Sequence, residues 1–265
     1  VLTGQDIPDI PLGFMRDNRP LKKGKVRTRR DEIAAVAAIS PDVAEEALSL
    51  IRVEYEPLPA LYSPEEALAE GAPHIHELDA KGRPAKSNKL SLPWKLLCGD
   101  VEEGRARSRH IAQGTYRTTW ISHCCLGTSG VIAEFDLNRN LTMYSITQIP
   151  YLAQNDYLEA LKAMGLPGSQ VRVLCQTIGG GFGSKLDTHC YEFIAILLAR
   201  ATGKPVKMQF TREEEFLAQA TRQPATMEIS QGCDAEGRLT FREVHMLLDN
   251  GGYTSWGATT PSVMM

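Results

Sequence analysis

The fold is decided by residues 176–185, which read Gln-Thr-Ile-Gly-Gly-Gly-Phe-Gly-Ser-Lys and lie between the apolar run 171–175 and a helical pattern. Four of the five residues 179–183 are glycine. Without a Cβ, this backbone can adopt positive φ and approach another group closely. A strand that runs through such a loop into a helix presents N–H donors and the positive end of the helix dipole, which together favour an anionic ligand. We therefore expect a ligand-binding loop, in which the ring of Phe182 needs a core pocket or a ligand face to cover it.

Two familiar phosphate-binding loops do not match these residues. A Walker A loop requires Gly-Lys followed by Ser or Thr, whereas Lys185 follows Ser184 here. A dinucleotide-binding fingerprint requires glycine at its sixth position, which is Ser184 counting from Gly179 and Leu186 counting from Gly181. A glycine-rich turn without any ligand remains an alternative.

Composition limits the classes of protein that the chain can represent. With 265 residues, 43% of them hydrophobic, and a net charge of −3, the chain is expected to be globular with one or two domains. The absence of a strong basic patch argues against nucleic acid and anionic membranes as partners. No apolar run reaches the ~18 residues of a membrane-spanning helix. The six cysteines include no Cys-x-x-Cys pair, so we expect free thiols and a cytoplasmic location.

The first part of the chain predicts a small α+β domain, residues 1–77. Apolar runs predict strands at 33–39 and 53–55, and helical spacing begins at Pro41, with Ser40 or Asp42 as the cap. A further helical turn is expected from Pro64. The basic run 22–30 is interpreted as a solvated loop, and the polar text of 78–92 as a linker.

The second part, residues 93–265, predicts a strand-rich domain. Gln148 stands at the turn between a predicted strand and a predicted helix, and the glycine loop stands at the next such turn. Both turns are therefore expected to open on the same edge of a sheet. The predicted strands are 110–120, 131–135, 141–145, 206–210, 225–231 and 239–248, and the predicted helices are 151–164 and 191–201.

The glycine loop, together with Ser-Ile-Thr-Gln at 145–148, resembles the molybdenum hydroxylases of the xanthine dehydrogenase and aldehyde oxidoreductase family. Similar phrases recur in the family's order, namely Val-Glu-Tyr-Glu-Pro-Leu-Pro at 53–59, Gly-Ala-Pro-His-Ile-His at 71–76 and Asp-Asn-Gly-Gly-Tyr-Thr at 249–254. The phrasing is closest to the bacterial branch that contains 4-hydroxybenzoyl-CoA reductase. The resemblance implies an α+β fold, with an N-terminally incomplete α/β-hammerhead domain at 1–77, a linker at 78–92 and a C-terminally incomplete first molybdopterin-binding domain at 93–265.

The resemblance also implies a site for a molybdenum–molybdopterin cofactor in its cytosine dinucleotide form. Gln148 matches the glutamine that approaches an oxo group of the metal, and Phe182 matches the phenylalanine whose backbone lies beside the metal, without direct ligation by either residue. A neutral amide can donate an N–H there without adding negative charge. The alternative for Gln148 is a polar residue at a helix start. The residues expected to bind the cofactor are Gln148, Gly180, Gly181, Phe182, Gly183 and Ser184.

Some residues depart from the family's pattern. Leu186 stands where purine-oxidising members carry a glutamate, which puts a purine site in doubt. Gly127 stands where an acidic residue is usual, so His123 is interpreted as structural. The acidic and histidine residues at 187–192 are interpreted as belonging to a helix start, where carboxylates are favoured by the helix dipole. The family's catalytic base and substrate loop have no counterpart in the sequence, so we expect this piece alone to be inactive.

The resemblance predicts the molybdopterin-binding portion of an oxidoreductase. The substrate would be a small aromatic, heteroaromatic, aldehyde or acyl-CoA compound, and electrons would pass to [2Fe–2S] and FAD groups on partner subunits or domains. The remaining part of the molybdenum subunit would be a further partner. The alternative is a non-catalytic binding or assembly module that cradles a phosphate-bearing ligand or a partner.

Overall fold

The computed structural model describes residues 1–79, 82–90 and 95–264, and the predicted linker therefore lies partly outside the described residues. Contacts between Cα atoms divide the chain into two compact units. The first contains Val1–Leu58, Ser122–Thr221 and Gly252–Ser255, and the second contains Pro59–Ile121, Arg222–Gly251 and Trp256–Met265. Each unit is assembled from separate segments of the chain, and the predicted domain boundaries in sequence remain a prediction.

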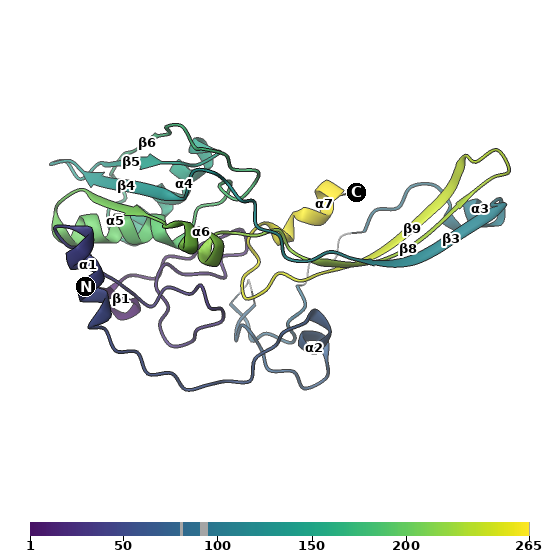
Figure 1. The fold of residues 1–265 in the computed structure, drawn as a ribbon, viewed down its shortest axis with the longest axis horizontal. Helices are drawn as coiled ribbons and strands as arrows, with labels where there is room; N and C mark the ends of the chain where they lie inside the picture. Colours follow the sequence, from purple (N-terminus) through teal and green to yellow (C-terminus); the bar gives the residue numbers. More distant parts are fainter. Residues whose placement is uncertain (80–81, 91–94, 265) are drawn as a thin grey trace. The chain divides into compact units, whose positions relative to one another are not determined.

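The first unit is built on a four-stranded sheet in the order β6-β5-β4-β7. Its strands are β4 (Gly130–Phe135), β5 (Leu141–Ser145), β6 (Val171–Leu174) and β7 (Val206–Gln209). Strands β5 and β6 are parallel neighbours, whereas β4 pairs antiparallel with both β5 and β7. Helix α4 (Pro150–Ala163) connects β5 to β6 and packs on β6, and α5 (Cys190–Thr202) packs on β4 and β7 (Figure 1).

Helix α5 forms the centre of the core of this unit. All ten of its residues from Cys190 to Ala199 are buried, as expected of a helix that is apolar on every side. Its partners include Tyr157 and Leu161 of α4 and Met143 of β5, all fully buried. The helix ends at Gly203, whose left-handed conformation (φ 65°) suits a residue without a Cβ. The predicted buried helix is thus confirmed.

The rest of the first unit is mostly loop with short elements. A two-stranded pairing joins β1 (Leu2–Thr3) and β2 (Ala34–Ala35), and η1 (Gly4–Asp6) follows β1. Helix α1 (Pro41–Ser49) is capped by Ser40, whose hydroxyl accepts a hydrogen bond from Val43 N–H. Helix α6 (Arg212–Ala218) was not predicted from the sequence.

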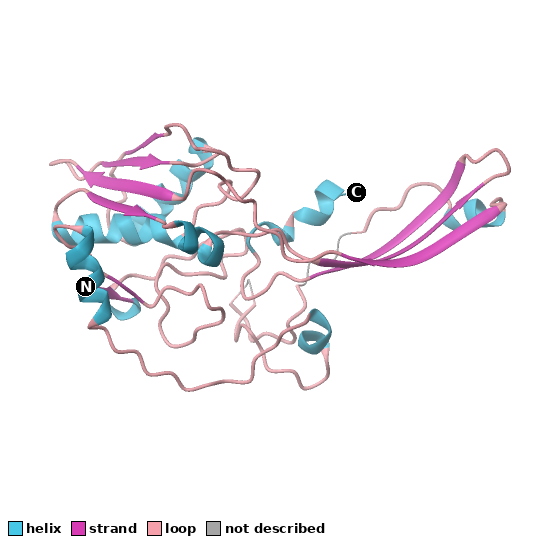
Figure 2. Ribbon diagram, viewed as in Figure 1, coloured by secondary structure: helices cyan, strands magenta, loops and turns pink. Residues whose placement is uncertain are grey.

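The second unit contains a three-stranded antiparallel sheet in the order β3-β8-β9 (Figure 2). The strands are β3 (His110–Arg117), β8 (Ala225–Cys233) and β9 (Leu239–Leu248), and the last two, at the strands predicted for 225–231 and 239–248, pair as a hairpin. Helix α3 (Val101–Ala106) packs on β9, where a Cβ on Gly104 would lie 2.5 Å from the carbonyl oxygen of Thr240. The unit also contains α2 (Pro64–Leu68), η2 (Ser255–Ala258), whose first residue belongs to the first unit, and α7 (Thr260–Met264).

Three expectations about the first 60 residues are wrong. The predicted strand 33–39 is reduced to the two residues of β2. The predicted strand 53–55 is absent, since no strand in the described part of the chain pairs with it, and Val53 and Tyr55 are exposed (41% and 63%). The basic run is not uniformly solvated, since Lys22 is buried and its Nζ lies 3.0 Å from Glu32 Oε2 and 2.8 Å from the carbonyl oxygen of Arg19.

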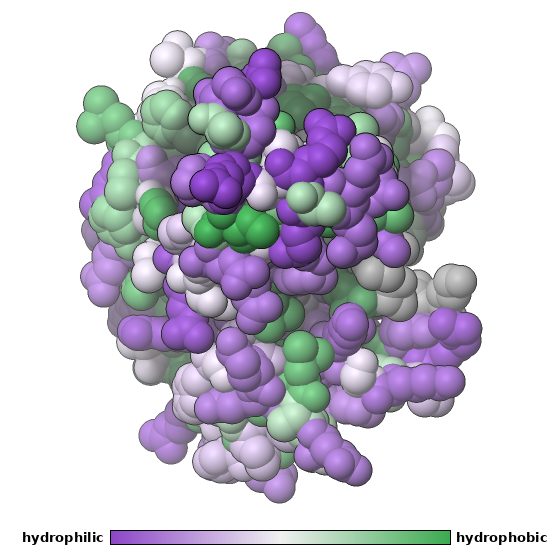
Figure 3. Space-filling view, turned by 90° about the vertical axis from the view of Figure 1, so that its right-hand side faces the viewer, coloured by the Kyte–Doolittle hydropathy of each residue, from purple (hydrophilic) through white to green (hydrophobic). Residues whose placement is uncertain are grey.

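Two features concern apolar residues, namely the length of the apolar helices and the distribution of apolar side chains on the surface. Among the described residues, no helix is both long and apolar enough to cross a lipid bilayer. On the face drawn in Figure 3, hydrophilic residues predominate, and hydrophobic ones stand singly or in small groups. Scattered apolar side chains of this kind are ordinary on a protein surface.

A buried hydrogen-bond network joins β5, α4 and α5. The carboxylate of Glu192, which is 2% exposed, accepts hydrogen bonds from Tyr157 Oη (2.6 Å), Ser145 Oγ (2.8 Å) and His189 N–H (2.8 Å). Burial raises the pKa of Glu192, and burial next to this carboxyl also raises the pKa of Tyr157. The network fixes the end of β5 against the start of α5.

Replacing Tyr157 with phenylalanine should reveal the contribution of this network to stability. The Tyr157→Phe variant leaves the buried Glu192 carboxyl without one of its donors, so we expect the free energy of unfolding to fall by about 1–3 kcal/mol. Denaturant unfolding followed by circular dichroism measures this change. Tyr151→Phe is the matched control, because Tyr151 lies on the same helix but is 70% exposed. Equal stability of the two variants would contradict the expectation.

Candidate cofactor-binding site

The parallel pairing of β5 and β6 brings Gln148 and the glycine loop together. The chain leaves both strands at the same edge of the sheet, as predicted, and the two turns are joined by hydrogen bonds. The N–H of Gln148 donates to the carbonyl oxygen of Lys185 (2.8 Å), and the hydroxyl of Thr147 donates to the same oxygen (3.3 Å). The predicted juxtaposition of the two turns is confirmed.

The side chain of Gln148 is oriented by the loop. Its Oε1 accepts hydrogen bonds from the N–H groups of Gly183 (3.0 Å) and Lys185 (3.2 Å). Only the oxygen of an amide can accept two such bonds, so the oxygen and nitrogen are assigned by the network. The Nε2 group, with two N–H donors, therefore faces away from these two loop amides.

Two glycines of the loop are required by close contact. A Cβ on Gly181 would lie 2.5 Å from Cδ and 2.7 Å from Cγ of Gln148, so no side chain fits there while Gln148 keeps its position. Gly179 packs against Gly127, whose N–H donates to the Gly179 carbonyl oxygen (2.9 Å), and a Cβ on Gly179 would lie 2.7 Å from Cα of Gly127. Gly179 also has a positive φ of 64°.

The middle of the loop presents unpaired donors and an exposed ring. Phe182 is 75% exposed and adopts a left-handed backbone conformation (φ 52°), which costs a residue with a Cβ about 1–2 kcal/mol. No described residue accepts a hydrogen bond from the N–H groups of Gly180, Gly181 or Phe182. The core does not cover the ring of Phe182, so the expected core pocket is ruled out, and cover by a ligand stays a prediction.

Ser184 is turned into the loop rather than out of it. Its hydroxyl is buried, donates to the carbonyl oxygen of Gly181 (2.9 Å) and lies 3.5 Å from Sγ of Cys125. The imidazole Nε2 of His189 lies 2.9 Å from the Ser184 carbonyl oxygen. In this arrangement Ser184 shapes the loop, and its predicted contact with a cofactor remains a prediction.

Lys185 fastens the loop from within, a role that sequence reasoning missed. Its side chain is 2% exposed, and its Nζ donates to the carbonyl oxygens of Gly127 (2.7 Å) and Ile178 (2.8 Å). Burial lowers the pKa of the Lys185 ammonium. The lysine therefore ties the start of the loop at Ile178 to the neighbouring segment at Gly127 instead of reaching towards a phosphate. In the sequence, the signal for this role was the position of Lys185 just after the glycine-rich residues 179–183.

His123 was interpreted as structural, and the structure adds a reason to consider it at the site. Its Nδ1 is buried and has no hydrogen-bond partner among the described residues. A Cβ on Gly183 would lie 3.6 Å from its Nε2, so the imidazole borders the loop. Buried polar atoms normally have a partner, and this one is a candidate to receive it from a ligand.

The acidic and histidine residues that follow the loop belong to a helix start, as interpreted. Glu192 and His189 form a capping box at the beginning of α5. Asp187 accepts hydrogen bonds from Ser255 Oγ (3.0 Å) and from the N–H of Thr188 (3.0 Å). No described group of three or more His, Cys, Asp and Glu residues is placed to hold a metal ion.

Comparison with known proteins identifies the family to which this chain belongs. Residues 82–265 match the model of the molybdopterin cofactor-binding domain, and residues 1–59 match that of the aldehyde oxidase and xanthine dehydrogenase a/b hammerhead domain. The chain is 36% identical over 248 residues to the nicotinate dehydrogenase large molybdopterin subunit of Eubacterium barkeri, a match that covers 92% of this chain and 54% of that one. It is 33% identical over 274 residues to the xanthine dehydrogenase molybdenum-binding subunit of Escherichia coli, covering 99% and 35%.

Solved structures give the same result for the fold. The aldehyde oxidoreductase of Desulfovibrio gigas superposes with a TM-score of 0.82 at 22% identity, covering 97% of this chain and 28% of that one. Quinoline 2-oxidoreductase of Pseudomonas putida superposes with a TM-score of 0.71 at 28% identity, covering 88% and 28%. The chain belongs to the xanthine dehydrogenase and aldehyde oxidoreductase family of molybdenum hydroxylases, and it spans about half or less of the length of these relatives.

Removing the Lys185 ammonium should loosen the loop. In Lys185→Met, two carbonyl oxygens lose their donor, and we expect the free energy of unfolding to fall by about 1–3 kcal/mol. Faster amide hydrogen exchange should accompany the loss at the N–H groups that have acceptors in and beside the loop, those of Gly127, Gly183 and Ser184. Lys204→Met is the control, because Lys204 is exposed and its ammonium makes no hydrogen bond among the described residues. Unchanged exchange in the loop of the Lys185 variant would show that the lysine does not hold it.

Proposed function

We propose that this chain is the molybdopterin-binding portion of a molybdenum-dependent hydroxylase or dehydrogenase, with the cofactor held at the glycine loop and Gln148. The observation that carries the proposal is the orientation of the Gln148 amide. Because Gly183 and Lys185 occupy Oε1, the N–H donors of Nε2 are available to an electron-rich group on the other side. A neutral donor of this kind stabilises such a group without the repulsion that a carboxylate would add.

The residues of the loop fit a cofactor rich in oxygen acceptors. The N–H groups of Gly180, Gly181 and Phe182 have no acceptor among the described residues, and the bare backbone allows close approach. The exposed ring of Phe182 offers an apolar cover, and Nδ1 of His123 is a further free position. When bound, the molybdenum cofactor supplies two-electron redox chemistry. In our proposal the residues of this chain bind the cofactor and orient it.

The reaction we propose is hydroxylation with water, or its reductive reverse, at an electron-poor carbon of a small substrate. Aromatic, heteroaromatic, aldehyde and acyl-CoA compounds are the candidate classes. Nicotinate dehydrogenase and quinoline 2-oxidoreductase are names that fit a heteroaromatic ring. Leu186 follows the loop directly and provides no hydrogen-bonding side chain, which favours a substrate without purine-like polar edges. The base is expected in sequence that the relatives carry outside the matched region.

The partners follow from the same proposal. Electrons would leave through [2Fe–2S] and FAD groups on partner subunits or domains, and the remaining part of the molybdenum subunit would complete the active site. The names of the relatives describe subunits, which supports an assembly of several chains. The cytosine dinucleotide form of the cofactor, the cytoplasmic location and a place in the 4-hydroxybenzoyl-CoA reductase branch are parts of the proposal that rest on sequence resemblance.

Metal analysis of the native complex separates this function from that of a non-catalytic binding or assembly module. We expect about one molybdenum per chain in the complex purified with its partners. Gly181→Val should abolish retention of the metal because the new side chain displaces Gln148, whereas Gly168→Val, at a glycine with no atom within 4 Å of its Cβ position, should retain it. A complex that is intact but free of molybdenum would support the binding module instead.

Two substitutions of Gln148 separate its two hydrogen-bonding ends. Gln148→Glu keeps an acceptor for Gly183 and Lys185 but replaces the Nε2 donors with a carboxylate oxygen, whereas Gln148→Ala removes both ends. We expect both variants to slow reduction of the enzyme by substrate at least tenfold, because donors are most effective where charge develops. Stability should fall more in the alanine variant. The rates are measured by stopped flow, with Gln170→Glu as the control variant. If both Gln148 variants react within about twofold of the parent and of the control, Gln148 is only a polar residue at a helix start.

A further inference from the structure

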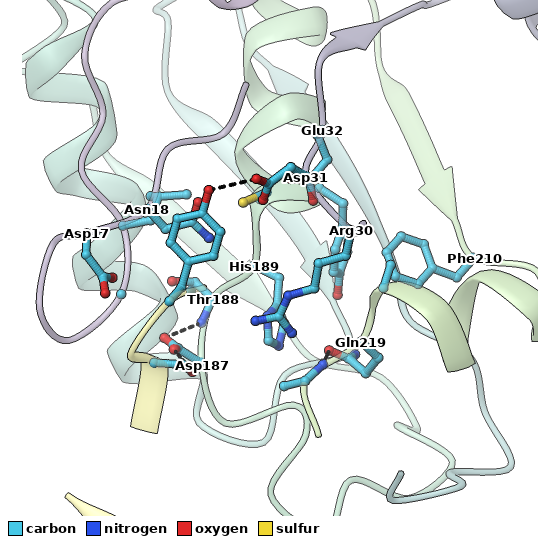
Figure 4. A pocket seen from close by; sticks show the side chains of 18 residues that line it. Asp17, Asn18, Arg30, Asp31, Glu32, Asp187, Thr188, His189, Phe210 and Gln219 are labelled. Carbon is cyan, nitrogen blue, oxygen red and sulfur yellow. Dashed lines mark hydrogen bonds between the residues drawn. The ribbon is translucent and has the colours of Figure 1, made fainter. Parts of the chain in front are cut away.

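A pocket of the first unit lies beside the start of α5. It is lined by residues of the segments 12–32, 187–191 and 210–220, together with Tyr253 and Ser255 (Figure 4). Its volume is about 60 Å³. At roughly 10–15 Å³ for each water-sized position, this is room for about four to six heavy atoms. The pocket therefore suits a very small ligand.

The acidic side chains of this pocket are already supplied with donors. Asp31 receives hydrogen bonds from Tyr253 Oη (3.0 Å) and the N–H of Arg27 (2.6 Å), and Glu32 is paired with Lys22 (3.0 Å). Asp187 receives a hydrogen bond from Ser255 Oγ (3.0 Å). Of the lining residues, Asp17 retains one buried oxygen, Oδ1, without a described partner.

The guanidinium of Arg30, in contrast to these carboxylates, lacks hydrogen-bond partners among the described residues. Its side chain is half-buried and reaches the part of the pocket that contains His189 and Gln219 (Figure 4). The backbone N–H of Arg30 donates to Thr28 Oγ1 (3.0 Å), but no described residue accepts a hydrogen bond from the guanidinium or forms an ion pair with it.

The neighbours of the guanidinium are otherwise engaged. His189 Nε2 lies 2.9 Å from the Ser184 carbonyl oxygen, and the Gln219 amide is bonded to Ser129 Oγ and to the N–H of Ala220. At this end of the pocket, the five N–H donors of the Arg30 guanidinium are thus the donors that still lack an acceptor among the described residues.

The chemical class of a ligand for Arg30 follows from the geometry of its guanidinium and from the other lining residues. A planar guanidinium with five donors matches a planar carboxylate through two parallel hydrogen bonds. The Arg30 guanidinium offsets one negative charge on a ligand, whereas Asp31, Glu32, Asp187 and the unpartnered oxygen of Asp17 repel every further one, so a doubly charged anion such as phosphate is less favourable than a singly charged carboxylate. Phe210 and Ala218 contribute apolar surface for a short carbon chain. We propose that this pocket binds a small monocarboxylate, of about the size of acetate, through Arg30.

Titration with acetate tests the proposal on the native protein with the chains that copurify with it. Isothermal titration calorimetry with sodium acetate, at an ionic strength held constant with sodium chloride, should give saturable binding. We expect Arg30→Gln to weaken binding at least tenfold and Arg30→Lys to weaken it less, because lysine keeps the charge but not the planar fork. Arg29→Gln is the matched control, since Arg29 is the exposed neighbour and does not line the pocket.

Three outcomes would overturn the proposal. These are the absence of saturable acetate binding by the parent, equal binding by Arg30→Gln and the parent, and binding of inorganic phosphate as tight as that of acetate. Thermal unfolding of each variant without acetate establishes that it is folded. If Arg30→Gln does not fold, the comparison of Arg30→Lys with Arg29→Gln decides. The molybdenum content of the preparation does not enter this measurement, so its outcome is independent of the proposed function.

Discussion

The first unit depends on the parallel pairing of β5 with β6, because this pairing places two strand-to-helix turns side by side. The hydrogen bonds from Gly183 and Lys185 to Gln148 Oε1 then fasten the turns to one another. Behind them, Glu192 connects the end of β5 to the start of α5. A sheet edge that would otherwise carry two independent loops becomes a single framework with a defined geometry.

Within this framework, the residues of the loop that point inwards and those that face outwards have different roles. Ser184 and Lys185 point inwards and satisfy carbonyl oxygens of the loop and its neighbours, so they set its shape. Gly180, Gly181 and Phe182 leave their N–H groups without an acceptor among the described residues, and in the proposed function they form the surface that meets the cofactor. A glycine-rich sequence is thus compatible with a well-ordered loop, because order comes from side chains that approach it from behind.

Much of this arrangement could be predicted from the sequence. Strong periodicity identified β4, β5, α4 and α5, and the succession of two strand-to-helix turns placed Gln148 near the glycine loop. The strand expected at 53–55 failed because apolar character alone does not supply a pairing partner. A local pattern carries no signal for contacts between segments far apart in the chain. Such contacts determine the inward roles of Lys185 and Ser184 and the burial of Lys22. They also determine that the Arg30 guanidinium has no acceptor among the described residues. The short helices α3 and α6 were missed because each offers fewer than two turns of periodicity.

The contact between Gly127 and Gly179 has a consequence for how this site can change over generations. A Cβ on Gly179 would lie 2.7 Å from Cα of Gly127, and a Cβ on Gly127 would lie 3.0 Å from Cα of Gly179, so a side chain at either position requires the facing backbone to shift. An acidic residue at 127, as is usual in the resembling family, is therefore accessible only after the loop at 179 has moved. The effects of substitutions at the two positions cannot be additive. The tolerance of each position to substitution therefore depends on which residue stands at the other, and a replacement at 127 is least costly in a chain whose backbone at 179 has already moved away.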